Sequence, residues 1–157
     1  MLTLESFKLL NPKVGQLERS TGGTPEITFQ EVTDVLSRCA RPVSVYARWN
    51  YGLEDTFQSK LVDVVIRFMV REDQSRKQPL LGSESAWRRV VELGVKTHRS
   101  SIWLTRQQRK SLANVRRWTR RHDEALRNVR SLLDEWDYEL RCELGIWNRA
   151  QLETSYG

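Results

Sequence analysis

The chain of 157 residues is poor in the residues from which metal and redox sites are built. It holds two cysteines and two histidines, and none of them has the spacing of a zinc ligand set. We therefore expect no disulfide framework, no metal and no cofactor. This composition is typical of a protein in a reducing compartment.

Long hydrophobic runs are missing too. No apolar stretch approaches the roughly 20 residues of a membrane helix, so we expect no membrane partner. The first residues lack the basic region and the small-residue cleavage site of a secretory signal. The length suits one domain, and we expect residues 1–157 to form it.

Catalytic motifs are absent as well. The chain has no His-Glu-x-x-His helix, no phosphate-binding glycine loop and no nucleophile elbow. Its acidic pairs, Asp123-Glu124 and Asp134-Glu135, stand in a charged helical pattern, where such pairs usually face solvent. We expect a protein that is not an enzyme.

Positive charge is concentrated in one segment. Residues 97–122 contain eight Lys and Arg and no acid, whereas the remainder has 18 basic against 20 acidic residues. The whole chain has a net charge of +6, so this segment carries the entire excess. It points to a polyanion partner, on whose bases Trp103 and Trp118 could stack. The alternative left open is that Trp118 is a core residue and the arginines only solubilise the surface.

Hydrophobic spacing predicts a mainly α protein with a short strand pair. Leu126, Val129, Leu133, Trp136 and Leu140 step three and four residues apart, as the buried face of a helix does. The other predicted segments, with their signals, are these: an N-terminal arm at 1–23; a helix from Thr24-Pro25-Glu26 to about Cys39; a helix at 44–61; a β-branched strand at 62–70; a polar loop at 71–81; a helix capped by Ser83 or Ser85 with Gly94 in its last turns; and a helix from near Thr119 that ends before Gly145 as its cap. Trp136 and Trp147 are predicted to be core or subunit-contact residues.

The C-terminal third carries an ordered series of short motifs. Residues 119–125 read Thr-Arg-Arg-His-Asp-Glu-Ala, and Arg130-Ser131, Glu139-Leu140, residues 145–149 (Gly-Ile-Trp-Asn-Arg) and Glu153 follow. In order and spacing this resembles the coat proteins of rod-shaped plant RNA viruses, the tobamoviruses and their virgavirus relatives. Their last long helix opens Thr-Arg-Arg-x-Asp-Asp-Ala and is followed by Gly-x-Tyr-Asn-Arg-x-x-Phe-Glu. The similarity runs without a gap over about 39 residues.

Upstream, the resemblance is thinner. Leu93-Gly94, Arg99 and Ile102 resemble the end of the family's preceding helix and its RNA-facing arginine. In the N-terminal half, residues 25–39, Ala47-Arg48 and residues 66–68 resemble its first helix, its second helix and its small sheet.

The resemblance implies an antiparallel four-helix bundle with a small β-sheet. It implies a capsid protein that forms an open helical homo-oligomer around single-stranded genomic RNA, found in the virion and, during assembly, in the host cytoplasm. Carried over by position, the RNA-binding residues are Arg99, Arg120 and Arg121 at phosphates, Asp123, Glu124 and Ser131 at the nucleotide pocket, and Arg48 from the second helix. To these the helical spacing adds Arg127, one turn beyond Asp123 and Glu124. Exposed apolar surface for subunit contacts is expected at residues 1–10, Trp147 and Leu152.

Some positions depart from the family pattern. Ser101 stands where the family has a second arginine, and Leu104 and Asn114 stand where it has mutually repelling carboxylates. We therefore expect the particle to lack the family's carboxylate disassembly switch. The basic inner segment should instead hold RNA more strongly or coat a wider range of RNA, so particle stability should fall steeply with salt. Two other function classes remain: a helical nucleic-acid-binding protein that does not assemble, such as a viral silencing suppressor or a phage or plasmid regulator, and a subunit of a nucleic-acid-processing enzyme.

Overall fold

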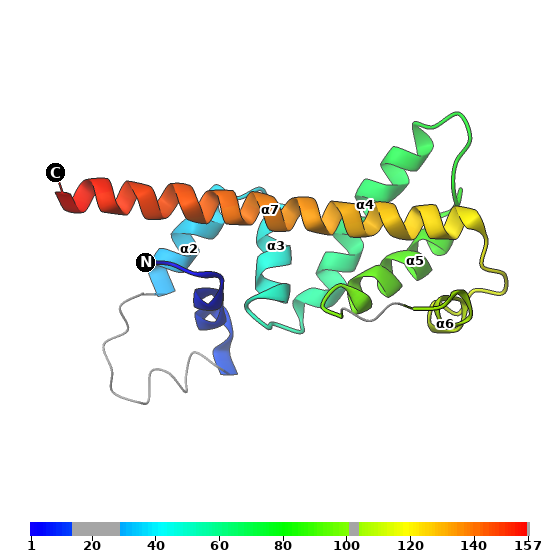
Figure 1. Cartoon of the computed structure of the whole chain (residues 1–157), viewed down its shortest axis with the longest axis horizontal. Helices are drawn as coiled ribbons and strands as arrows, with labels where there is room; N and C mark the ends of the chain where they lie inside the picture. The colour runs from blue at the N-terminus through cyan, green and yellow to red at the C-terminus, as the bar shows by residue number, and fades with distance from the viewer. Residues whose placement is uncertain (14–28, 101–103, 157) are drawn as a thin grey trace. The chain divides into compact units, whose positions relative to one another are not determined.

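The computed structural model describes residues 1–13, 29–100 and 104–156, and all regular structure in these ranges is helical (Figure 1). The elements are the 3-10 helix η1 (Leu4–Leu10) and the α-helices α2 (Phe29–Arg38), α3 (Arg41–Asn50), α4 (Phe57–Gln74), α5 (Glu84–Thr97), α6 (Arg106–Leu112) and α7 (Arg120–Tyr156). The mainly α prediction is confirmed. The predicted helix start at Thr24-Pro25-Glu26, together with Ile102 and Trp103, lies outside the described residues.

The predicted strand at 62–70 is wrong, because these residues form the middle of α4. Val62, Val65, Ile66 and Met69 are the buried residues of this stretch and, with Leu61 before it, recur with the period of a helix. Burial of this one face outweighs the β propensity of the valines and the isoleucine. No strand, and hence no small sheet, occurs in the parts of the chain that the structure describes.

The single helix expected at 44–61 is divided in two. Helix α3 ends at Asn50, and α4 begins at Phe57. Gly52 lies in the turn between them, where a Cβ atom would come within 2.6 Å of the Arg48 carbonyl oxygen. Leu53 follows with a φ of 56°. Glycine is therefore the only residue type that fits at this position beside the end of α3.

Helix α5 begins as predicted. The Ser83 hydroxyl accepts a hydrogen bond from the Ala86 amide and caps the helix, and Gly94 lies in its last turns. Asp73, near the end of α4, fixes the preceding loop: its carboxylate accepts hydrogen bonds from the amides of Leu80 and Gly82 and from the indole of Trp87.

Helix α7 is longer than predicted. It runs to Tyr156, so Gly145 is an internal residue and not a cap, and the prediction of an end there is wrong. The five residues of the predicted buried face, Leu126, Val129, Leu133, Trp136 and Leu140, are all buried, at 0 to 4% exposure. Trp147 is buried as well.

The chain divides into two compact units. Residues 1–58 and 135–157 form one, and residues 59–134 form the other. In the first, Leu2, Phe7 and Leu10 are buried, and the Leu2 backbone exchanges two hydrogen bonds with the Asn148 side chain. The second comprises α5, α6, most of α4 and the first part of α7.

Candidate nucleic-acid interface

The two units differ in charge. Residues 59–134 hold 18 Lys and Arg against 8 Asp and Glu, a net charge of +10, and are called the basic unit below. The remaining residues hold 8 against 12, a net charge of −4, and are called the acidic unit. Outside residues 97–122 the basic unit holds ten Lys and Arg against eight Asp and Glu, so most of its positive charge comes from that segment. A polyanion would be attracted to this unit.

Four of the predicted site residues share one face of α7. Arg120, Glu124, Arg127 and Ser131 are all exposed, and their spacing of four, three and four residues places them in a row along the helix. Ala125, Leu126 and Val129, on the opposite face, are buried. We call this row of four residues the α7 stripe.

The charges of the α7 stripe are mostly uncompensated within the protein. Glu124 lies 3.5 Å from Arg76 in a partly exposed ion pair. Arg120 and Arg127 form no ion pair with any described residue, and neither does Arg121, which is exposed beside the stripe. These three guanidinium groups can therefore donate hydrogen bonds to phosphates without first breaking a described salt bridge.

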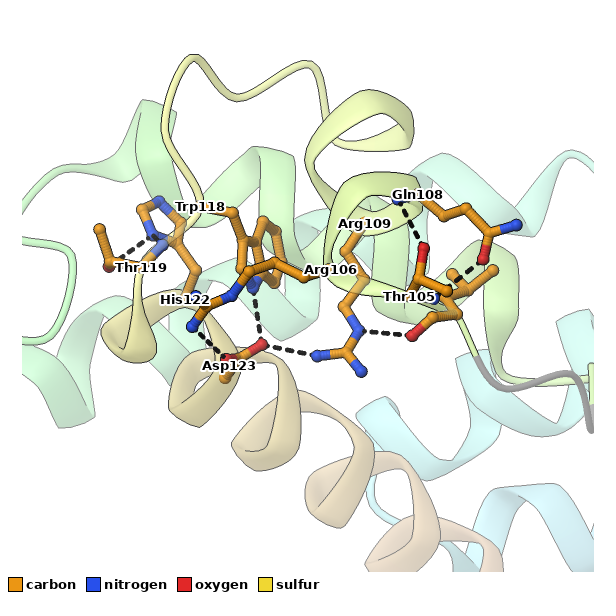
Figure 2. A network of polar contacts seen from close by, with 9 residues as sticks. Thr105, Arg106, Gln108, Arg109, Trp118, Thr119, His122 and Asp123 are labelled. Carbon is orange, nitrogen blue, oxygen red and sulfur yellow. Dashed lines mark hydrogen bonds and ion pairs between the residues drawn. The ribbon is translucent and has the colours of Figure 1, made fainter.

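Asp123 faces a different environment, shown in Figure 2. Its carboxylate accepts hydrogen bonds from Arg109 at 2.7 Å and from the Trp118 indole at 2.6 Å, and lies 3.6 Å from Arg106. Burial alone raises the pKa of Asp123, but these donors and the positive charges of Arg109 and Arg106 outweigh it and leave the pKa below its ordinary value. Asp123 thus anchors α6 to the first turn of α7.

The same contacts decide the role of Trp118. Its side chain is 5% exposed, and its ring stacks on that of His122 with centroids 5.1 Å apart. It is a core residue, as the alternative reading held, and its faces are not open to a base. His122 in turn accepts a hydrogen bond at Nδ1 from the Thr119 amide, and this bond stabilises the start of α7.

The basic segment at residues 97–122, which the family resemblance places as an inner loop, contains the short helix α6. Thr105 and Gln108 form a reciprocal capping box at the start of α6, and the Arg109 side chain donates to the Leu104 carbonyl. Arg130, on α7, is partly buried, and its pKa is lowered by burial and by the positive charge of Arg109. Cations therefore outnumber carboxylates around this helix, which adds to the positive field of the basic unit.

The structure does not bring all predicted residues together. Arg99 is exposed just after the end of α5, next to residues 101–103 that the structure does not describe. Arg48 belongs to the acidic unit, where its guanidinium donates to the buried Glu54 at 2.7 and 3.0 Å and lies 4.3 Å from the centroid of the Phe57 ring. Its observed partners are those of a structural arginine.

Sequence reasoning missed one group of cations. Arg67 and Arg71 on α4 are exposed and, with Arg88 on α5, line a groove of 570 Å³. They were overlooked because the sequence analysis placed Arg67 in a strand at 62–70 and Arg71 in the polar loop at 71–81 that follows it. A helical reading of the same residues would have shown them four residues apart on one face.

No protein family, no curated protein and no solved structure matches this chain. Among the described residues no helix is long and apolar enough to span a membrane, and no group of three or more His, Cys, Asp or Glu could hold a metal ion.

Proposed function

We propose that this chain is the coat subunit of a rod-shaped plant RNA virus, which assembles into an open helical rod around single-stranded genomic RNA. The observation that carries the proposal is the α7 stripe. Three positions that the family resemblance assigns to RNA, namely Arg120, Glu124 and Ser131, face solvent in one row with Arg127, which the helical spacing added. Arg120 and Arg127 form no ion pair with any described residue. The resemblance comes from the sequence alone, and the common face comes from the helix register.

The charge distribution supports binding to a polyanion without regard to sequence. A coat must accept every part of a genome, so most of its affinity should come from phosphate contacts. The +10 charge of the basic unit supplies these. The acidic unit, at −4, is unsuited to the same ligand.

The order of the helices is the basis on which we propose the bundle fold. Along the chain, α2, α3, α5 and α7 follow in the order that the resemblance implies for the four helices of an antiparallel bundle, which we propose as the fold. Helix α4 stands where the family resemblance implied the small sheet.

Assembly requires apolar surface that remains exposed on the subunit. In the acidic unit, Met1, Tyr138 and Leu152 are 75, 69 and 46% exposed. Trp147, Leu2 and Phe7, which the sequence also suggested for this role, are buried and are excluded from it. We propose that the exposed side chains take part in heterologous contacts, which build a rod of indefinite length.

Negative-stain electron microscopy with and without single-stranded RNA tests the proposal. Rods or stacked discs that lengthen with the RNA supplied are the expected result. Small closed particles that bind RNA without enclosing it would refute the coat function and the virion location. They would establish the alternative, a nucleic-acid-binding protein that does not assemble.

Binding by the α7 stripe is tested separately. Each phosphate contact on a single strand contributes about 0.7 to the slope of log K against log salt. Arg120→Gln with Arg127→Gln should therefore reduce that slope by about 1.4. Arg38→Gln with Arg41→Gln, two exposed arginines of the acidic unit, is the matched control and should leave it unchanged. Equal slopes for both double variants would refute a role for the stripe.

A further inference from the structure

Four exposed arginines lie where the chain enters α7. Arg116 and Arg117 belong to the turn between α6 and α7, and Arg120 and Arg121 belong to the first turn of α7. Three residues span at most about 11 Å of backbone, so the two pairs lie close together. We call these four residues the arginine cluster. Neither the family resemblance nor the α7 stripe includes Arg116 and Arg117.

The positive charge of the arginine cluster is not balanced by neighbouring carboxylates. Residues 113–122 contain no Asp or Glu. The first acids after them, Asp123 and Glu124, already form ion pairs with arginines of other segments, namely Arg106, Arg109 and Arg76. No arginine of the cluster forms an ion pair or a hydrogen bond with any described residue. Four positive charges are therefore left for a ligand.

The arginine cluster also lies where positive charge is unfavourable for the fold. The N-terminal end of a helix carries a partial positive charge, so cations in its first turn are repelled. Arg120 and Arg121 are in that turn of α7, and Arg116 and Arg117 come just before it. A surface that only improves solubility would mix charges of both signs. Four like charges at this helix end therefore favour an anionic ligand, which removes the repulsion.

The turn that carries Arg116 and Arg117 is held on both sides. Before the two arginines, the Val115 amide donates a hydrogen bond to the Lys110 carbonyl at 3.1 Å. After them, the buried Trp118 donates from its indole to Asp123 at 2.6 Å (Figure 2). A turn fixed in this way loses little conformational entropy when it binds, so its cations are preorganised for a ligand.

We propose that the arginine cluster binds neighbouring phosphates of single-stranded RNA, with Arg116 and Arg117 as additional phosphate contacts. The inference rests on the proposed RNA binding of the chain and extends it from α7 to the turn that precedes the helix. Guanidinium groups suit this role because each can donate two parallel hydrogen bonds to one phosphate. Contacts to phosphates carry no sequence information, so the cluster binds RNA without regard to its bases.

The test measures the affinity of the full chain for an unstructured oligouridylate across a series of salt concentrations. Arg116→Gln with Arg117→Gln should reduce the slope of log K against log salt by about 1.4. Arg116→Lys with Arg117→Lys keeps both charges and should retain the slope. Arg38→Gln with Arg41→Gln in the acidic unit is the control of equal charge change and should also retain it.

Urea unfolding followed by circular dichroism gives a second readout. Arg116→Gln with Arg117→Gln should unfold at a higher urea concentration than wild type, because the repulsion at the start of α7 is reduced. A lower midpoint would overturn the inference, since it would show that the two arginines stabilise the turn.

The outcomes separate this inference from the proposed function. A wild-type slope for Arg116→Gln with Arg117→Gln, while Arg120→Gln with Arg127→Gln loses slope, overturns the additional contacts and leaves RNA binding by the α7 stripe intact. A wild-type slope with weaker self-association in sedimentation also overturns them, and assigns Arg116 and Arg117 to contacts with the acidic unit of another copy. If the wild-type chain does not bind the oligouridylate at low salt, both proposals fall.

Discussion

Replacement of Asp123 by alanine separates a structural from an RNA-binding role for this carboxylate. Three groups depend on it: the Trp118 indole, the Arg109 guanidinium and, at 3.6 Å, Arg106. Trp118 is buried, and the Arg109 side chain is only 14% exposed. Asp123→Ala removes the acceptor that these two donors share, although Arg109 keeps its hydrogen bond to the Leu104 carbonyl.

The expected cost follows from this burial. A hydrogen bond to a charged group contributes about 1.5–3 kcal/mol, and a buried donor left unsatisfied costs about 1–3 kcal/mol. The Asp123 side chain is 24% exposed, so water can reach part of the site and reduces the penalty. We expect Asp123→Ala to lower the free energy of unfolding by about 2–4 kcal/mol. Asp123→Asn, which can still accept from Trp118, should lower it by about 1–2 kcal/mol.

The pH dependence gives an independent readout. Because the folded-state pKa of Asp123 is lowered, its contribution is present above the unfolded-state pKa of about 3.9 and is lost as the pH falls through the folded value. The stability difference between wild type and Asp123→Asn should be constant near neutral pH and shrink below about pH 4. Urea unfolding followed by circular dichroism measures the difference, and hydrogen exchange of the α6 amides locates it.

Glu124→Ala is the matched control, since it removes the neighbouring carboxylate. Its ion pair with Arg76 is 3.5 Å long and partly exposed, so screening by water should limit the loss to less than about 1 kcal/mol. Equal losses for the two alanine variants, or normal exchange protection of α6 in Asp123→Ala, would show that the Asp123 network does not hold α6.

Three further predictions concern other parts of the structure. A Cβ atom on Gly94 would lie 2.6 Å from the buried Val129 Cγ1, so Gly94→Ala should lower the free energy of unfolding by about 1 kcal/mol or more. A Cβ atom on Gly145 meets no atom within 4 Å, so Gly145→Ala should raise the free energy of unfolding by about 0.5–1 kcal/mol. A stabilised Gly94→Ala variant would contradict close packing of α5 on α7. Asp73→Ala should cost about 2–4 kcal/mol in urea unfolding, because three loop amides and a buried indole lose their acceptor, and a loss under 1 kcal/mol would argue against this role. Burial and nearby carboxylates raise the pKa of Cys39 to about 11, so iodoacetamide at pH 8 should modify the exposed Cys142 first. Mass spectrometry of the peptides measures the two rates of modification. Equal rates would contradict the burial of Cys39.

The sequence was sufficient where local patterns act alone. The apolar spacing from Leu126 to Leu140 specified the buried face of α7. The same helical register placed Arg120 and Arg127 on the exposed face. The hydroxyl of Ser83 marked the start of α5 because capping depends only on residues within one turn. Charge counts located the positive excess, since charge does not depend on conformation.

Other features were decided by contacts between distant residues. Residues 62–70 carry β-branched side chains, yet they form a helix because this conformation buries Val62, Val65, Ile66 and Met69 on one face. Gly145 has the residue type of a helix cap, but the buried Leu144 and Trp147 beside it favour continuation of the helix. In both cases burial of apolar surface exceeds the local preference of the backbone.

The candidate site shows the same division. Sequence alone determined which residues are cationic and which of them share the face of α7, because both follow from composition and helical period. Only the tertiary structure decided that Asp123 is engaged by Arg109 and Trp118, and that Arg67 and Arg71 line a groove with Arg88. These arrangements join side chains from different helices and from the turn before α7, and no local pattern encodes a distance between helices.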